Sequence, residues 1–223
     1  MNKKFFRKDN LGLIVGVIGV VALIAAFTVN SSKSTDKVKN TASAPAVAGD
    51  DMAGHHSAAP RPESSLNDLV GQSAPNFSLA DRDGKIYSSE SLRGKNVVLF
   101  FNEGLMCYPA CWNQIVSLAK DERFNQLKDA VVLSVIVDPK EDWQTAVAKM
   151  PELGLAKVVF DGGAAFSQSL GVLNVPSSMH YGSLPGHTYL ILDSEGVIRY
   201  VLDDPKMALR NDQLFDELNK LKS

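Results

Sequence analysis

Two continuous apolar runs place the strongest limit on what this chain can fold into. They are "NVVLFF" (96–101) and "AVVLSVIVD" (130–138), and each holds few polar residues. Successive side chains of a strand point to opposite faces of its sheet, so a strand that is apolar at nearly every position is covered on both faces. Between the runs, from Ala110 to about Leu127, apolar residues recur at helical spacing. This alternation predicts an α/β domain in which helices cover a central sheet.

The rest of the domain continues the alternation and adds two hairpins. "NFSLADRDGKIYS" (76–88) indicates two strands around an Asp-Gly turn, and "TYLILDSEGVIRYVLDD" (188–204) two strands around Glu195 and Gly196. An antiparallel hairpin after alternating strands and helices makes the predicted sheet a mixed one. The other predicted elements are a helix at 143–150, a short strand at 157–161, a helix at 164–172 and an amphipathic C-terminal helix with Asn211 as its N-cap.

The N-terminus predicts a membrane anchor. Residues 1–10 are basic, and an uncharged, mostly apolar run follows from 11 to 29. At about 1.5 Å per residue, a helix of this length spans roughly 28 Å, close to the hydrocarbon thickness of a bilayer. Because basic flanks stay on the cytoplasmic side, residues 1–10 are expected to be cytoplasmic. We therefore expect a single-pass anchor in the cell membrane, with the folded domain on the extracytoplasmic side. A cleaved signal peptide is the alternative, although its apolar region is usually shorter. The basic residues are Lys3, Lys4, Arg7 and Lys8.

Composition separates a linker from the domain. Residues 30–65 are rich in Ser, Thr, Ala, Lys, Asp and Pro and hold almost no large apolar side chain. Such a segment cannot bury enough surface to offset the entropy of ordering, so we predict a flexible linker, with residues 66–223 as the folded domain. The formal net charge is −2, and the C-terminal two-thirds of the chain has no Lys/Arg cluster interleaved with aromatic residues. Both observations argue against a nucleic-acid partner.

The two cysteines stand close together in "LMCYPACWNQ" (105–114), with three residues between Cys107 and Cys111. They fall between the strand that ends at Phe101 and the next helix, with Pro109 at the first position of that helix. A helix N-terminus favours thiolate over thiol, and an exported chain lies where disulfides form, so these features predict a redox pair. The alternatives are two inert buried thiols and a structural disulfide, although closing so short a loop contributes only about 2 kcal/mol in the entropy model.

The order of the segments resembles the thioredoxin-fold superfamily, specifically its AhpC/TSA (redoxin, peroxiredoxin-like) branch. "GQSAPNFSLADRDGKIYSSESLRGKNVVLFF" (71–101) is similar to that branch's N-terminal hairpin and first core strand. "VVFDGGAAFSQSLGV" (158–172) and "PGHTYLILDSEGVIRYV" (185–201) are similar to its later elements, so the resemblance spans about residues 70 to 222. It implies a thioredoxin-like fold: a central mixed β-sheet flanked by helices, with an N-terminal β-hairpin extension and a redox site at the start of the helix that contains Cys111.

The sequence departs from the peroxiredoxin pattern at two places. Peroxiredoxins carry P-x-x-x-T-x-x-C, but Gly104 and Tyr108 stand three residues before the first and the second cysteine. The Thr is therefore absent whichever cysteine is aligned. Six residues before Asp193, where peroxiredoxins place an Arg, this chain has His187.

The resemblance implies an oxidoreductase that acts on thiols and disulfides or on peroxides, with an antioxidant role in the peroxide case. Cys107 and Cys111 would cycle between dithiol and disulfide, and no cofactor is implied because the cysteines carry the electrons. Further candidates are His187 as a thiolate-stabilising or acid/base group, Glu103 as a proton acceptor for the second thiol, and Trp112 as a wall that shields the disulfide. The expected partners are a protein or small-molecule disulfide or peroxide, an unidentified thiol donor, and the membrane through the N-terminal helix.

The C-x-x-x-C spacing also resembles that of the Sco-type copper chaperones, which are membrane-anchored thioredoxin folds with a His as third copper ligand. "SVIVDPKED" (134–142) is similar to a segment of that family too. This resemblance implies copper bound by Cys107, Cys111 and His187, and two thiolates with an imidazole suit that metal. The alternatives to a thiol oxidoreductase are therefore a copper metallochaperone and a redox-inert domain that binds a partner in its groove.

Overall fold

The computed structural model describes residues 66–221. The predicted cytoplasmic segment (1–10), anchor (11–29) and linker (30–65) lie outside the described residues, so they stay predictions from the sequence. Within 66–221, no helix is both long enough and apolar enough to cross a bilayer.

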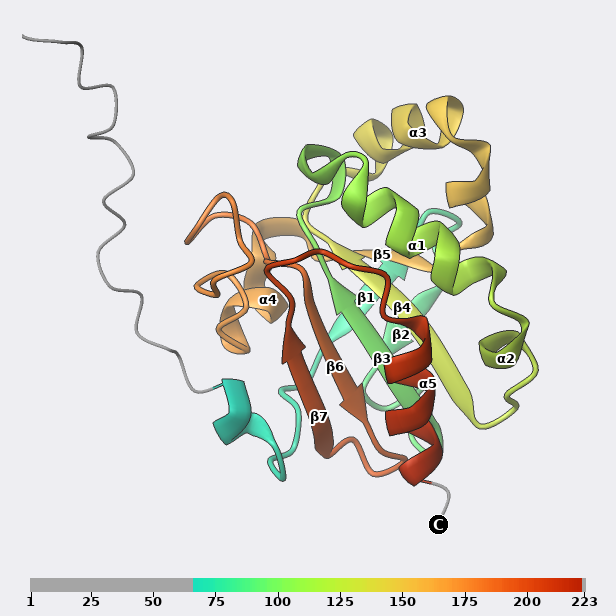
Figure 1. The fold of residues 1–223 in the computed structure, drawn as a ribbon, viewed down its shortest axis with the longest axis vertical. Helices are drawn as coiled ribbons and strands as arrows, with labels where there is room; N and C mark the ends of the chain where they lie inside the picture. Colours follow the sequence, from blue (N-terminus) through green and yellow to red (C-terminus); the bar gives the residue numbers. More distant parts are fainter. Residues whose placement is uncertain (1–65, 222–223) are drawn as a thin grey trace, which may run out of the picture. The chain divides into compact units, whose positions relative to one another are not determined.

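Seven strands of the described chain form one sheet: β1 (Ser78–Asp81), β2 (Ile86–Ser88), β3 (Asn96–Phe101), β4 (Ala130–Ile136), β5 (Val158–Phe160), β6 (Thr188–Leu192) and β7 (Ile198–Asp203). Their order across the sheet is β2-β1-β5-β4-β3-β6-β7 (Figure 1). β4 pairs parallel with β3 and β5, and the other neighbours pair antiparallel. The sheet is therefore mixed, with a hairpin near each end of the domain sequence, as predicted.

The α-helices of residues 66–221 are α1 (Ala110–Lys120), α2 (Glu122–Asn125), α3 (Lys140–Lys149), α4 (Ala165–Ser169) and α5 (Asn211–Lys220), with 3-10 helices η2 (Leu66–Leu69), η3 (Gly104–Cys107), η4 (Pro151–Leu155) and η5 (Gly162–Ala164). The long helix predicted from Ala110 to about Leu127 is broken at Asp121. The side chain of Asp121 accepts a hydrogen bond from the backbone N–H of Arg123 and caps the short helix α2. That cap replaces a continuous helix with two shorter ones.

The C-terminal helix also begins differently from the prediction. Asn211 is the first residue of α5, and the N-cap position belongs to Arg210. The Asn211 side-chain amide donates to the backbone carbonyl of Ser117 at 3.1 Å and to Asp121 Oδ2 at 2.9 Å. Asn211 therefore joins α5 to the end of α1, because its amide finds acceptors on α1 and not on its own helix.

Alternate residues of β3 face two separate apolar clusters. All six residues of β3 are buried. Figure 1 shows α1 and α5 lying over one face of the sheet. β3 is therefore buried on both faces, as its uniform apolar run predicted. One cluster contains Val98, Phe100, Ile115, Trp143, Tyr189 and Leu214, and the other contains Val97, Leu99, Phe101, Phe77, Phe166 and Leu190.

The strand directions bring two chain segments to one end of the sheet. β6 runs antiparallel to β3, with Thr188 opposite Phe101. Because of that register, the loop that follows Phe101 and carries the cysteines lies beside the residues that precede Thr188. The candidate site is therefore formed where β3 ends and β6 begins.

Candidate redox site

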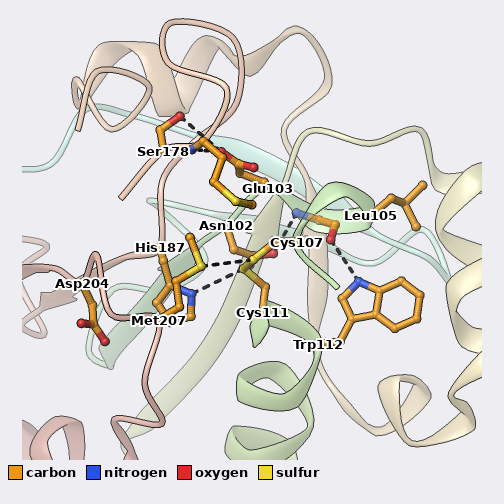
Figure 2. The surroundings of a disulfide bond; sticks show 12 residues. Asn102, Glu103, Leu105, Cys107, Cys111, Trp112, Ser178, His187, Asp204 and Met207 are labelled. Carbon is orange, nitrogen blue, oxygen red and sulfur yellow. Dashed lines mark hydrogen bonds between the residues drawn. A yellow bond between two sulfur atoms is a disulfide. The ribbon is translucent and has the colours of Figure 1, made fainter. Parts of the chain in front are cut away.

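Cys107 and Cys111 form a disulfide, with their Cα atoms 5.4 Å apart (Figure 2). Cys107 is the last residue of η3 and Cys111 the second residue of α1, so Pro109 precedes α1 and does not occupy its first position. Both cysteines are buried, at 2% and 0% exposure. A reactant therefore reaches the sulfur atoms only after a neighbouring group moves aside.

Met207 covers the Cys107 side of the disulfide. Its Sδ lies 3.9 Å from Cys107 Sγ. Met207 adopts a left-handed backbone conformation, with φ 48°, which is uncommon for a residue other than glycine. The turn is fixed by the carboxylate of Asp204, which accepts hydrogen bonds from the backbone N–H groups of Lys206 and Ala208. The same carboxylate pairs with Arg210 at 2.7 Å, so the thioether is held against the disulfide.

His187 lies on the Cys111 side of the disulfide. Its Nδ1 is 3.4 Å from Cys111 Sγ, and its Nε2 is 2.8 Å from the hydroxyl of Tyr189. The imidazole is 1% exposed and packs edge-on against the ring of Phe100. Burial lowers the pKa of His187 to about 4, against the opposing charge of Asp204. The ring is therefore neutral at pH 7.

This buried neutral histidine makes stability depend on pH. The pKa is about 4 in the folded protein against 6.5 ordinarily, so between these values the unfolded chain binds the proton and the folded chain does not. The free energy of unfolding therefore has its full His187 contribution above about pH 6.5, and this contribution is lost as the pH falls through about 4. Between pH 7 and pH 4 the wild-type protein is expected to lose about 3 kcal/mol more unfolding free energy than His187→Gln.

Denaturant unfolding followed by tryptophan fluorescence measures this difference, because both tryptophans of the chain, Trp112 and Trp143, lie in the described domain. The background titration of the carboxylates is shared by the two proteins and cancels in the comparison. Equal losses for wild type and His187→Gln would contradict a buried neutral imidazole.

Glu103 points away from the disulfide, toward a neighbouring loop (Figure 2). Its Oε1 accepts from the backbone N–H groups of Met179 and His180 and from the hydroxyl of Ser178. Its Oε2 lies 2.8 Å from Nδ1 of His180. The side chain is 1% exposed. These contacts favour an anchoring role for Glu103 over the proton-acceptor role suggested by the sequence.

Trp112 packs beside the cysteine loop. Its indole N–H donates to the backbone carbonyl of Gly104 at 3.0 Å, and its ring meets those of Tyr108 and Trp143 edge-on. The residue is 4% exposed. Trp112 therefore fixes the loop and lines a cleft of about 470 Å³ next to it, whose other lining residues are Leu105, Tyr108, Thr145, Lys149 and Met150.

Gly104 and Asp138 set the path of the chain before Cys107. Asn102 Oδ1 accepts from the backbone N–H of Gly104 at 3.0 Å, and Asp138 Oδ2 accepts from that of Leu105 at 3.2 Å. Burial raises the pKa of Asp138. Gly104 has φ 55°, and a Cβ there would lie 1.7 Å from Asp138 Oδ2. This crowding is a physical reason why no threonine occupies the position three residues before Cys107.

Gly104→Ala is expected to lower the free energy of unfolding by about 3 kcal/mol, from the left-handed backbone and the overlap with Asp138 together. Gly163→Ala is the matched control, because Gly163 has φ 77° and no atom within 4 Å of an added Cβ. The control is expected to cost about 1 kcal/mol, from the backbone alone. Denaturant titration of both variants measures the difference, and equal costs would show that the loop yields easily at Gly104.

The fold and the site define a class: a thioredoxin-like α/β protein with a disulfide at the start of the helix that follows its central strand. The family model for Redoxin matches residues 69–208, and the chain belongs to the redoxin family. The resemblance drawn from the sequence is thereby confirmed.

Individual relatives agree with this assignment. Peroxiredoxin Q of Triticum aestivum chloroplasts is 31% identical over 60% of this chain and 58% of its own length. The chain thus spans less than two-thirds of that plant relative. Peroxiredoxin Bcp of Escherichia coli K12 is 29% identical over 68% of this chain and 96% of its own. These relatives favour the peroxiredoxin resemblance over the Sco-type one.

Solved structures agree with the fold. The reduced 2-Cys peroxiredoxin of Plasmodium vivax has a TM-score of 0.57 at 20% identity and covers 69% of this chain and 96% of its own. A putative protein disulfide isomerase from Bacteroides thetaiotaomicron has a TM-score of 0.53 at 21% identity, over 69% of this chain and 91% of its own. At these identities the likeness concerns the fold alone.

Proposed function

We propose that this protein is a thiol-dependent oxidoreductase that reduces peroxides or disulfides through Cys107 and Cys111. The observation that carries the proposal is a disulfide between these residues beside the imidazole of His187, in a chain of the redoxin family. The similarity to peroxiredoxin Q and peroxiredoxin Bcp supports a peroxide as the substrate. The threonine and the arginine of the peroxiredoxin pattern are absent, so the proposal includes disulfides as substrates as well as peroxides.

In the reductive half of the cycle, a donor thiolate attacks Cys107 Sγ and forms a mixed disulfide. The Cys107–Cys111 bond breaks, and its electron pair passes to Cys111 Sγ as a thiolate. A second donor thiol then attacks the mixed disulfide and releases Cys107. The donor is oxidised to its disulfide and the protein is left as a dithiol.

In the oxidative half, a proton passes from the Cys107 thiol to the Cys111 thiolate, and the Cys107 thiolate so formed attacks one oxygen of a peroxide. The O–O bond breaks, Cys107 becomes a sulfenic acid, and the other oxygen leaves as an alcohol or water after it gains a proton. Cys111 then attacks the sulfenic sulfur, a water molecule leaves, and the disulfide forms again. With a disulfide substrate the same two sulfurs react by exchange, and the substrate gains both electrons.

The test uses the purified full-length protein, first reduced and then freed of reductant. Hydrogen peroxide or a model disulfide is added with a regenerating thiol donor, and donor consumption is followed. Sustained peroxide consumption over repeated cycles supports the peroxidase branch, and sustained consumption of the disulfide alone moves the assignment to thiol-disulfide exchange. No turnover of either substrate would contradict the proposal.

Copper binding is the second candidate. It is supported by the donor atoms of Cys107, Cys111 and His187, which all lie within 4.8 Å of one another. The thioether of Met207 adds a fourth soft group beside Cys107. Cuprous ion is therefore a third arm of the same test. Stoichiometric binding that His187→Ala abolishes, without turnover of peroxide or disulfide, would favour the copper carrier.

We also propose that the domain is anchored in the cell membrane and faces the extracytoplasmic side. The support is the apolar run 11–29 behind the basic residues 1–10. Two experiments test this proposal. One is alkaline extraction of native membranes, and the other is proteolysis of cells whose outer layers have been made permeable to an added protease. Retention in the membrane with external cleavage of the domain is expected. A soluble protein with an intact N-terminus contradicts the anchor, and one that begins after residue 29 indicates the cleaved signal peptide.

A further inference from the structure

The two sulfurs of the disulfide have different neighbours. Cys111 Sγ lies 3.4 Å from Nδ1 of His187, which is able to carry a proton. Cys107 Sγ lies 3.9 Å from the thioether of Met207, which has no proton to donate. The pair is therefore electrostatically unequal, although both residues are buried in one apolar cluster.

The tyrosine two residues after His187 bears on where the imidazole proton sits. Tyr189 is fully buried in β6, on the same face as His187, and its ring stacks on Phe100 with centroids 4.6 Å apart. Within residues 66–221, the hydroxyl of Tyr189 is hydrogen-bonded to Nε2 of His187, at 2.8 Å. A buried phenol that does not donate leaves its proton without an acceptor, which is unfavourable. The hydroxyl therefore donates to Nε2, and the single proton of the neutral ring is on Nδ1.

We propose that Tyr189 is a positioning residue that holds the His187 proton on Nδ1, directed at Cys111, and that this makes Cys111 the sulfur that leaves when the disulfide is opened. The proposal rests on the proposed function, because it assigns roles within the same thiol cycle. Its new content is that Tyr189 orients the imidazole and thereby sets the direction in which the disulfide is opened; Figure 2 shows His187 beside Cys111.

The direction follows from the electron count. An attacking thiolate forms its bond to Cys107 Sγ, and the electron pair of the broken S–S bond passes to Cys111 Sγ. The Nδ1–H group donates a hydrogen bond to that new thiolate while His187 keeps its proton. A better-stabilised thiolate is a better leaving group, and the position of Cys111 in the first turn of α1 acts in the same direction. Attack at Cys111 would instead place the charge beside a thioether.

Two pKa shifts support the assumed protonation states. Burial raises the pKa of Tyr189, so its phenol keeps its proton and is able to donate. Burial lowers the pKa of His187 to about 4, so the ring has one proton to place. The charged groups nearby, Asp204 and Arg210, pair with each other at 2.7 Å. Their opposite effects on the imidazole offset one another in part, and a backbone hydrogen bond with Ala208 also acts to raise the pKa of His187.

The decisive experiment is ¹⁵N NMR of the imidazole in the oxidised full-length protein, with the His187 signals assigned by their loss in His187→Gln. The chain has four histidines, so the spectrum is tractable. Protonated Nδ1 is expected in the wild type, and Tyr189→Phe is expected to shift the population toward the Nε2-protonated form. A wild-type ring protonated on Nε2 would overturn the proposal, even if Tyr189→Phe does not fold.

The second readout is the equilibrium with a thiol–disulfide buffer. Loss of one oriented hydrogen bond to the thiolate is expected to shift the dithiol–disulfide equilibrium of Tyr189→Phe about tenfold toward the disulfide. Tyr200→Phe is the matched control, because Tyr200 lies on the adjacent strand β7 and its phenol hydroxyl is bonded to Gln213 of α5. Equal equilibria for Tyr189→Phe and the wild type would also overturn the proposal. Neither readout needs peroxide turnover, so failure of the proposed function is seen separately.

Discussion

Serine at Cys111 is expected to give a protein that reacts once with peroxide and then stops, whereas serine at Cys107 removes the reaction at its first step. Cys107 is the attacking sulfur in the proposed cycle, so Cys107→Ser lowers turnover by about 10³-fold or more. In Cys111→Ser the sulfenic acid on Cys107 has no resolving thiol. One equivalent of peroxide is then consumed per protein, and mass spectrometry after trapping with a sulfenic-acid reagent locates the product on Cys107.

Met106→Ser is the control for this pair, because Met106 precedes Cys107 and is 58% exposed, with no role assigned to its side chain. It is expected to keep wild-type turnover. If the single-turnover phenotype appears in Cys107→Ser and the inactive one in Cys111→Ser, the two roles are reversed. That result would also remove the basis for Tyr189 as the residue that makes Cys111 leave.

The strands were predictable because their patterns depend on burial, which the local sequence records. The run 96–101 has apolar residues for both faces, and both faces of β3 are covered. The break between α1 and α2 was not predictable in the same way. Apolar residues keep their helical spacing from α1 across the break and on to Phe124 in α2. Phe124 still packs inward, against Phe215 of α5, so the periodicity survives the break at Asp121. Periodicity reports which side faces the core and not whether the hydrogen-bond ladder is continuous.

The site was predictable only where short spacing or family resemblance connects its residues. The cysteines are four positions apart, and the resemblance pointed to His187 through the hairpin that follows it. Tyr189 carried a usable signal, since residues two apart in a strand share a face. Neither Met207 nor the residues that bond to Glu103 carried a signal of this kind in the sequence. Their contacts join residues 75 to 100 positions apart, and no local pattern encodes such a pairing.

Glu103→Ala is expected to lower the free energy of unfolding by about 4 kcal/mol, the largest stability effect among these variants. The substitution removes a carboxylate that accepts from the backbone N–H groups of Met179 and His180 and from the hydroxyl of Ser178. Glu103→Gln is expected to cost only about 1 kcal/mol, because the amide oxygen still accepts both. Glu152→Ala, an exposed glutamate paired with Lys120, serves as the surface control and is expected to cost under about 0.5 kcal/mol.

The Gln variant also separates anchoring from proton transfer at Glu103. An amide has no basic oxygen, so a catalytic carboxylate would lose its function in Glu103→Gln while the fold stays intact. If the residue anchors the Ser178–His180 segment, turnover stays within about twofold of wild type, since the two backbone bonds that position the loop are kept. A stable Glu103→Gln with turnover lowered about 100-fold would contradict the anchoring role. The carboxylate would then have to turn from His180 toward the sulfur atoms during the cycle.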